Sequence, residues 1–205
     1  MVGVKQFDIN EALDRAMAVF WDLGYEATSV DDLTKATRVS RSSLYNTFGN
    51  KEDLFILVID HYLEKSRPAF QAALDHADLY AAVLGALTVL KDRLMEKSSK
   101  AGCLLVLAAE NSESRAPGIK RRVARAFADE DRAFYARFRQ AQVDGQLAAA
   151  ADAQVLARFF SAQGRAMGIN ARISGDPSVH DDVIKMSLEA LRPYLQSPLT
   201  KSASA

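Results

Sequence analysis

The sequence predicts an all-α protein, and two observations support this fold class. Apolar residues recur at spacings of three and four along the chain of 205 residues. There are only five prolines, and no run of alternating valine, isoleucine and threonine indicates strands. Hydrophobic residues make up 49% of the chain, which is enough to bury a substantial core. The apolar spacing predicts about nine helices.

The first four helices follow from their caps and apolar stripes. The pattern predicts them over residues 9–23, 29–37, 40–47 and 51–74. Asp8, Ser29 and Ser40 are placed to cap the first three through their side-chain oxygens. Gly24 is expected to end the first helix, because glycine tolerates the left-handed conformation common after a helix.

The remaining helices are predicted from the same spacing, over residues 79–97, 103–109, 117–143, 153–173 and 179–195. The segment 103–109 is apolar throughout, as expected of a buried helix. The last helix has two apolar stripes: Ile184, Leu188, Leu191 and Leu195, and Val183, Met186, Ala190 and Tyr194. A helix that is apolar on two sides needs two surfaces to bury against. One stripe is therefore expected to face its own core and the other a second subunit.

The composition argues against several classes of protein. The longest apolar runs are far shorter than the roughly 20 residues that span a bilayer, so no membrane partner is expected, and no basic region followed by an apolar stretch indicates a signal peptide. The single cysteine, Cys103, excludes an intramolecular disulfide and fits the cytoplasm. The three histidines are scattered, without catalytic or metal-ligand spacing. We expect no catalytic residue, no metal site and no cofactor.

Charge is distributed unevenly although the formal net charge is zero. Residues 34–51 contain no acidic side chain, and four of them are basic: Lys35, Arg38, Arg41 and Lys51. A charge run of this kind is usually a solvated surface, so alone it indicates nucleic-acid binding only weakly. The zero net charge argues against a protein that is basic over its whole surface.

The second and third predicted helices are too short to be stable alone. They become stable when they pack at an angle against the first and fourth helices, with a small core of Val30, Leu33, Val39, Leu44 and Phe48. Two such helices joined by a short turn form a helix-turn-helix, whose second helix enters the major groove of DNA.

This segment resembles the TetR family signature. The matching residues are Thr28-Ser29, Val39-Ser40-Arg41-Ser42-Ser43-Leu44-Tyr45, Phe48 and Lys51-Glu52. The resemblance covers about residues 9–57, and the remaining two thirds resemble the family in length and helical pattern. Thr37-Arg38 stands where alanine-glycine is usual, which bears on the turn conformation because a non-glycine residue must tolerate its backbone angles. Ser42 stands where glycine is frequent, and Asn46 stands where tyrosine or histidine is common. Both departures alter the bases that are read.

The resemblance implies a set of DNA-binding residues: Thr28, Ser29, Arg41, Ser42, Ser43, Tyr45, Asn46 and Lys51. Thr28 and Ser29 would hold a phosphate at a helix N-terminus, and Arg41 would bond guanine bidentately. Lys51 would clamp the DNA backbone at the start of the fourth helix. The alternative for the serines is helix capping, which is favoured for Ser40 and compatible with phosphate binding for Ser29.

The resemblance also implies an effector cavity in the C-terminal bundle. Its expected lining is Cys103, Phe127, Phe134, Phe159, Gln163 and Met167, although each of these residues also suits an ordinary core. An apolar cavity favours a hydrophobic or aromatic effector. Cys103 starts an apolar helix, with Lys97 and Lys100 close in sequence, so its thiol could sense electrophiles. The Gly-Cys-Leu string resembles TetR-like regulators that do so.

The expected function is that of a homodimeric repressor, released from a palindromic DNA operator by a small hydrophobic or electrophilic effector. Its expected parts are a DNA-binding domain over residues 1–50, a ligand-binding and dimerisation domain over 51–197 and a flexible tail over 198–205. Dimerisation is expected through the last two helices. Two alternatives remain: an all-α enzyme or carrier without DNA binding, and an activator that uses the same DNA chemistry.

Overall fold

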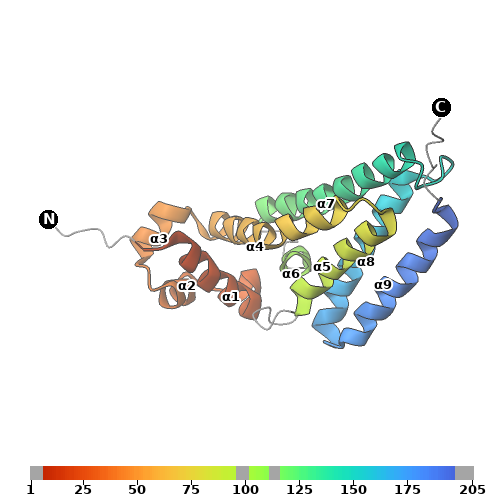
Figure 1. Cartoon of the computed structure of the whole chain (residues 1–205). Helices are drawn as coiled ribbons and strands as arrows, with labels where there is room; N and C mark the ends of the chain where they lie inside the picture. Colours follow the sequence, from red (N-terminus) through yellow and green to blue (C-terminus); the bar gives the residue numbers. More distant parts are fainter. Residues whose placement is uncertain (1–6, 96–101, 111–115, 197–205) are drawn as a thin grey trace, which may run out of the picture. The chain divides into compact units, whose positions relative to one another are not determined.

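The computed structural model describes residues 7–95, 102–110 and 116–196, and this part of the chain is helical (Figure 1). The helices are α1 (Ile9–Ala27), α2 (Val30–Thr37), α3 (Arg41–Phe48), α4 (Lys51–Leu74), α5 (Leu79–Met95), α6 (Leu104–Glu110), α7 (Pro117–Val143), α8 (Ala153–Ile173) and α9 (Pro177–Leu191), followed by the 3-10 turn η1 (Arg192–Tyr194). The predicted all-α fold class is confirmed. The predicted tail over 198–205 lies outside the described residues.

Two helix ends differ from the prediction by four residues, and several others differ by one or two. Gly24 does not end α1: it has φ 76° and ψ 167°, so it interrupts the helix, which then resumes to Ala27. The predicted end is therefore a kink, which glycine accommodates because it has no Cβ. The last helix ends at Leu191 instead of residue 195. Pro193 explains this end, because proline has no backbone N–H to continue the helical bonds.

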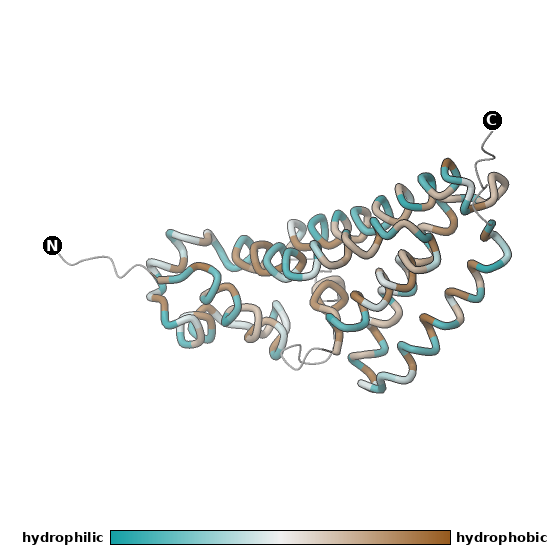
Figure 2. Tube along the Cα trace, in the orientation of Figure 1, coloured by the Kyte–Doolittle hydropathy of each residue, from teal (hydrophilic) through white to brown (hydrophobic). Residues whose placement is uncertain are grey.

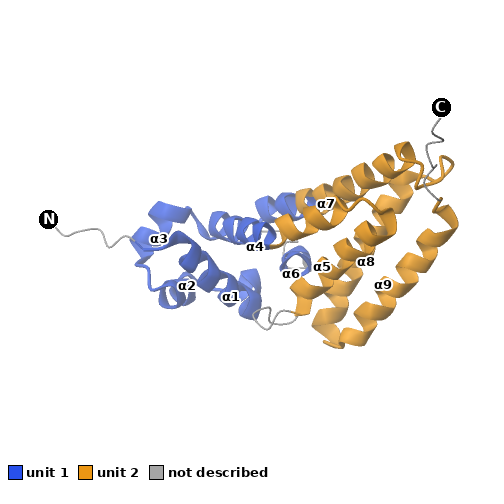
Figure 3. Ribbon diagram, viewed as in Figure 1, with its two compact units in different colours: residues 1–65, 97–100, 104–124 blue, residues 66–96, 101–103, 125–205 orange. Residues whose placement is uncertain are grey.

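The described residues form two compact units (Figure 3). Unit 1 contains residues 7–65, 104–110 and 116–124, and unit 2 contains 66–95, 102–103 and 125–196. Both α4 and α7 therefore contribute to both units. The expected boundary at residue 50 falls inside unit 1, which adds the first part of α4, α6 and the start of α7 to the three N-terminal helices.

The core of unit 1 forms where α1 packs on α2 and α6. Phe20 and Phe55 bring α1 and α4 together with ring centroids 4.5 Å apart, and Trp21 meets Tyr62 edge-on at 5.3 Å. Most of the predicted small core of the helix-turn-helix is also buried: Leu33, Val39, Leu44 and Phe48. Through these residues α2 packs against α1, and α3 packs against α2.

The core of unit 2 forms where α5 packs on α8 and α9, and α8 packs on α9. Its centre is aromatic, with Phe134, Phe138 and Phe160 fully buried. The apolar segments are visible along these helices in Figure 2. The two stripes predicted on α9 differ as expected: Ile184, Leu188 and Leu191 are buried, whereas Met186 is 63% exposed. No helix in the described ranges is both long and apolar enough to cross a membrane.

Candidate nucleic-acid interface

The start of α2 is closed by a reciprocal cap between Ser29 and Asp32. The Ser29 hydroxyl accepts a hydrogen bond from the Asp32 backbone N–H at 3.1 Å and donates to the Asp32 carboxylate at 2.6 Å. That carboxylate also accepts the Ser29 backbone N–H at 3.0 Å. The bonds from Ser29 lower the pKa of Asp32 below its usual value. Ser29 is therefore a helix cap, and any phosphate contact would be additional to that role.

The turn between α2 and α3 is left-handed at a residue that is not glycine. Arg38 has φ 59° and ψ 25° at the C-cap of α2. Thr37 fixes the turn on both sides: its hydroxyl donates to the Leu33 carbonyl at 2.7 Å and accepts the Val39 N–H at 3.3 Å. The departure from the usual alanine-glycine pair thus keeps the left-handed turn, with an arginine in the position of the glycine.

The helix α3 has one buried face and one polar face. Ser40 caps it by accepting the Ser43 N–H at 3.2 Å, and its hydroxyl also donates to the Ser43 hydroxyl at 2.9 Å. Leu44 and Phe48 are buried on the inner face. The exposed residues of the outer face include four of the predicted DNA-binding set: Arg41, Ser42, Tyr45 and Asn46. The outer face of α3 therefore presents hydrogen-bonding groups to solvent.

Arg41 is tethered only loosely. Its guanidinium lies 3.9 Å from the Asp31 carboxylate and 6.0 Å from the centre of the Tyr45 ring. Both side chains of the ion pair are mostly exposed, and exposed pairs of this kind contribute about 0–1 kcal/mol. The guanidinium can therefore leave Asp31 for a stronger acceptor at small cost.

Lys51 has a structural role that its sequence context does not indicate. Its Nζ donates to the Thr28 carbonyl at 2.7 Å and to the Glu26 carbonyl at 3.4 Å, and it lies 4.4 Å from the centre of the Tyr25 ring. Burial lowers the pKa of Lys51. An ammonium has three donors, and two of them hold the start of α4 to the end of α1.

Thr28 is the predicted DNA-binding residue that the structure turns inward. It is 1% exposed, and its hydroxyl donates to the Gly24 carbonyl at 2.6 Å. The hydroxyl is therefore committed to the kink in α1, because that carbonyl lies where the helical bonds are interrupted. Only the backbone of Thr28 is left to meet a ligand.

The predicted effector residues of unit 2 occupy different environments. Phe134 and Met167 are fully buried, whereas Phe159 is 38% exposed. The Arg165 guanidinium lies 5.1 Å from the centre of the Phe127 ring. Gln163 is half-buried and Cys103 is buried. Lys97 and Lys100, expected near that cysteine, lie outside the described residues.

A cavity of about 360 Å³ lies elsewhere in unit 2, between the end of α4, the loop that follows and α7. None of the predicted effector residues lines it. Its walls include Leu74, His76, Ala133, Ala136, Arg137 and Gln140.

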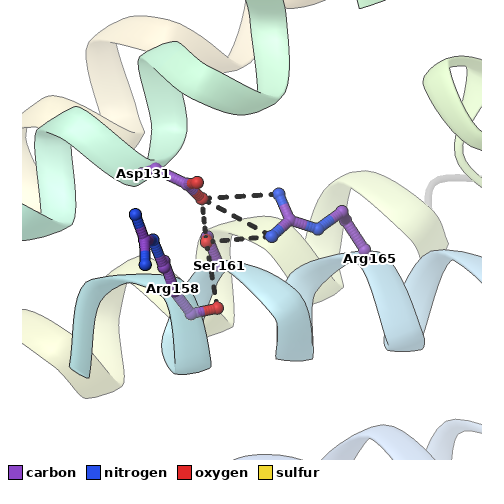
Figure 4. A network of polar contacts seen from close by, with 4 residues as sticks. All are labelled: Asp131, Arg158, Ser161 and Arg165. Atoms are coloured by element: carbon purple, nitrogen blue, oxygen red, sulfur yellow. Dashed lines mark hydrogen bonds and ion pairs between the residues drawn. The ribbon is translucent and has the colours of Figure 1, made fainter. Parts of the chain in front are cut away.

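A polar cluster between α7 and α8 was not predicted (Figure 4). The Asp131 carboxylate accepts a hydrogen bond from the Ser161 hydroxyl and lies 3.4 Å from the Arg165 guanidinium. Next to it, burial raises the pKa of Glu130 to about 7, while the charges of Arg93 and Arg165 oppose this shift. The Glu130 Oε1 atom is buried and meets no hydrogen-bond donor within the described part of the chain.

Two family models match the chain. The model described as "Bacterial regulatory proteins, tetR family" matches residues 12–58, and the model "Tetracyclin repressor-like, C-terminal domain" matches residues 80–187. The first match contains α2 and α3 with their turn, and the second extends from α5 into α9.

Curated relatives match across most of the chain. The HTH-type transcriptional repressor ComR of Escherichia coli is 31% identical over 170 residues, which is 82% of this chain and 81% of ComR. The uncharacterized HTH-type transcriptional regulator YezE of Bacillus subtilis is 28% identical over 91% of this chain and 97% of its own length.

Solved structures share the fold. A cysteine mutant of the TetR family transcriptional regulator CifR, complexed with a 26-base-pair operator DNA, has a TM-score of 0.85 at 31% identity and covers 92% of this chain and 99% of its own. A TetR transcriptional regulator from Chloroflexus aurantiacus has a TM-score of 0.80 at 21% identity, over 91% of this chain and 96% of its own.

Proposed function

Because this chain belongs to the tetR family of bacterial regulatory proteins, we propose that it is a homodimeric repressor that leaves its operator when a small ligand binds unit 2. As a member of this family it is a DNA-binding transcriptional regulator and not an enzyme. The proposal concerns the direction of regulation, the dimer and the effector. We further propose that the protein acts in the cytoplasm, where bacterial DNA lies.

The DNA-binding surface is the outer face of α3 together with the start of α2. Arg41, which is exposed and loosely tethered, reads a guanine in the major groove through two hydrogen bonds. The remaining contacts are supplied by Ser42, Ser43, Tyr45, Asn46 and the backbone at Thr28 and Ser29, while Lys51 offers its third N–H to a phosphate. The observation that carries this assignment is the polar outer face of α3 on a buried apolar base.

Repression is supported by the relative ComR, which is named a transcriptional repressor. A protein that covers a promoter blocks transcription without further contacts, whereas activation needs a surface for the polymerase. The test is a reporter gene placed behind the operator, which is first selected from a random DNA library with the purified protein. Repression predicts lower reporter output when the protein is produced, and higher output would indicate an activator.

Dimerisation through α8 and α9 is supported by the apolar side chains that these helices expose. In α8, Val155 is 58% exposed, Ile169 45% and Ile173 78%. In α9, Met186 is 63% exposed. A two-fold dimer buries such residues and places the two recognition helices on half-sites about 34–36 Å apart or a multiple of this distance.

A matched pair of variants tests the dimer. Ile173 on α8 and Val143 at the end of α7 are both 78% exposed and apolar. Ile173→Asp places a charge in the proposed interface and is expected to convert the dimer to monomer in analytical ultracentrifugation. Val143→Asp is the control and should remain dimeric. Equal behaviour of the two variants would argue against the α8–α9 interface.

The effector site is proposed within unit 2, at the aromatic core between α7 and α8. The members assigned to it are Cys103, Phe127, Phe134, Phe159, Gln163 and Met167. A hydrophobic or electrophilic effector suits this composition. Binding would favour a spacing of the two recognition helices that no longer matches the half-sites, which shifts the population away from DNA. The helix α4 contributes residues to both units, so it is the proposed link between the effector and the DNA-binding surface.

A further inference from the structure

The turn between α2 and α3 holds a large cationic side chain in a backbone conformation that suits glycine. Arg38 is the one non-glycine residue with positive φ among those that the structure describes. In this region Cβ crowds the backbone of any residue except glycine. An arginine in this position therefore lowers the stability of the turn relative to a glycine.

No contact within the described residues offsets this cost. Thr37 and Val39, which flank Arg38, are buried and held by hydrogen bonds. The Arg38 side chain is exposed, and no described residue gives it a hydrogen bond, an ion pair or a ring contact. The contacts of the described residues therefore do not explain why an arginine occupies this strained position.

The neighbouring cations are engaged differently. Arg41 has a long ion pair with Asp31, and Lys51 donates to the Thr28 carbonyl. Arg38 keeps its full hydrogen-bonding capacity. Arg38 lies two residues before Ser40, the N-cap of α3. It is therefore next to the N-terminal end of α3, the helix proposed to enter the DNA groove.

We infer that Arg38 is a further DNA-binding residue, whose guanidinium binds a backbone phosphate beside the groove that α3 enters. This inference rests on the proposed DNA-binding surface. The chain has no net charge, so its attraction to phosphates depends on local cations. A guanidinium matches a phosphate with two parallel hydrogen bonds, and strained backbone positions are concentrated at functional sites.

Three variants separate the charge of Arg38 from its backbone conformation. Arg38→Gly removes both the charge and the strain. Arg38→Asn removes the charge but tolerates the left-handed conformation, and Arg38→Lys keeps a charge. Thermal unfolding of each variant is measured beside its affinity for two duplexes, one selected as the operator and one of mixed sequence, over a range of KCl concentrations.

Stability and affinity are expected to change in opposite directions. Arg38→Gly should raise the Tm by about 2–6 °C, because the strain is relieved. Its affinity for both duplexes should fall, by roughly 8-fold for each lost phosphate contact at about 0.1 M salt, and the salt slope should decrease by about 0.9 per subunit. Arg38→Asn should lose affinity similarly, and Arg38→Lys should retain most of it.

Two results would overturn the inference in distinguishable ways. If the wild-type protein binds the DNA and Arg38→Gly binds it with the same affinity and salt slope, Arg38 is a solvated surface residue and only this inference is wrong. If the wild-type protein binds neither duplex, the proposed function is wrong as well.

Discussion

The buried carboxylate of Glu130 predicts how the stability of this protein changes with pH. Burial raises its pKa from 4.5 to about 7 in the folded chain. Between these two values the folded state holds a proton that the unfolded state has released. The contribution of Glu130 to stability is therefore fully present below about pH 4.5, and this contribution is lost as the pH rises through about 7.

The size of the effect follows from the two pKa values. They differ by roughly 2.5 pH units, and each unit corresponds to about 1.4 kcal/mol. Glu130 thus lowers the free energy of unfolding by on the order of 1–3 kcal/mol between pH 5 and pH 8. Glutamine is neutral at both pH 5 and pH 8. Replacing Glu130 with glutamine therefore removes this loss of stability.

The assay is urea unfolding of the wild type and Glu130→Gln at pH 5 and pH 8. The variant is expected to lie within about 1 kcal/mol of the wild type at pH 5 and to be more stable by about 1–3 kcal/mol at pH 8. Glu189→Gln is the control, because Glu189 is a surface residue paired with Arg192 and should contribute less than about 1 kcal/mol. An identical pH dependence in the wild type and Glu130→Gln would refute the reasoning.

Two further predictions concern the DNA-binding surface and the thiol. Arg41→Ala should raise the Kd for the selected operator roughly 5- to 150-fold without changing the Tm, because Arg41 is exposed; unchanged affinity in a binding titration would exclude base recognition by this residue. Cys103→Ser should bind the operator normally but keep its affinity after treatment with a maleimide, whereas the treated wild type should lose it. If treatment releases both proteins equally, Cys103 is not the sensor.

The helix caps and most helix boundaries could be predicted because they depend on local chemistry. Asp8, Ser29 and Ser40 cap their helices as expected, since each side-chain oxygen bonds a backbone N–H three residues away. The two faces of α9 were also predictable from spacing alone. The predicted helix end at Gly24 is wrong because the sequence does not distinguish a glycine that ends a helix from one that bends it.

The interactions that escaped prediction join residues far apart in the sequence. Lys51 donates to a carbonyl 23 positions earlier, and this bond depends on how α4 packs against the end of α1. Glu130 and Asp131 belong to an acidic run that resembles a solvated face. Their environment is set by Arg93 on α5 and by Ser161 and Arg165 on α8, and no local pattern in α7 indicates it.

The most direct test of the central claim is a DNase I footprint of the purified protein on its selected operator. The proposed function has α3 reading DNA and α8 and α9 forming the dimer. It predicts two protected half-sites that are related by two-fold symmetry and lie about one helical turn, or a multiple of it, apart. Protection should disappear as the salt concentration rises. Absence of protection at low salt, or a single unpaired site, would contradict the account.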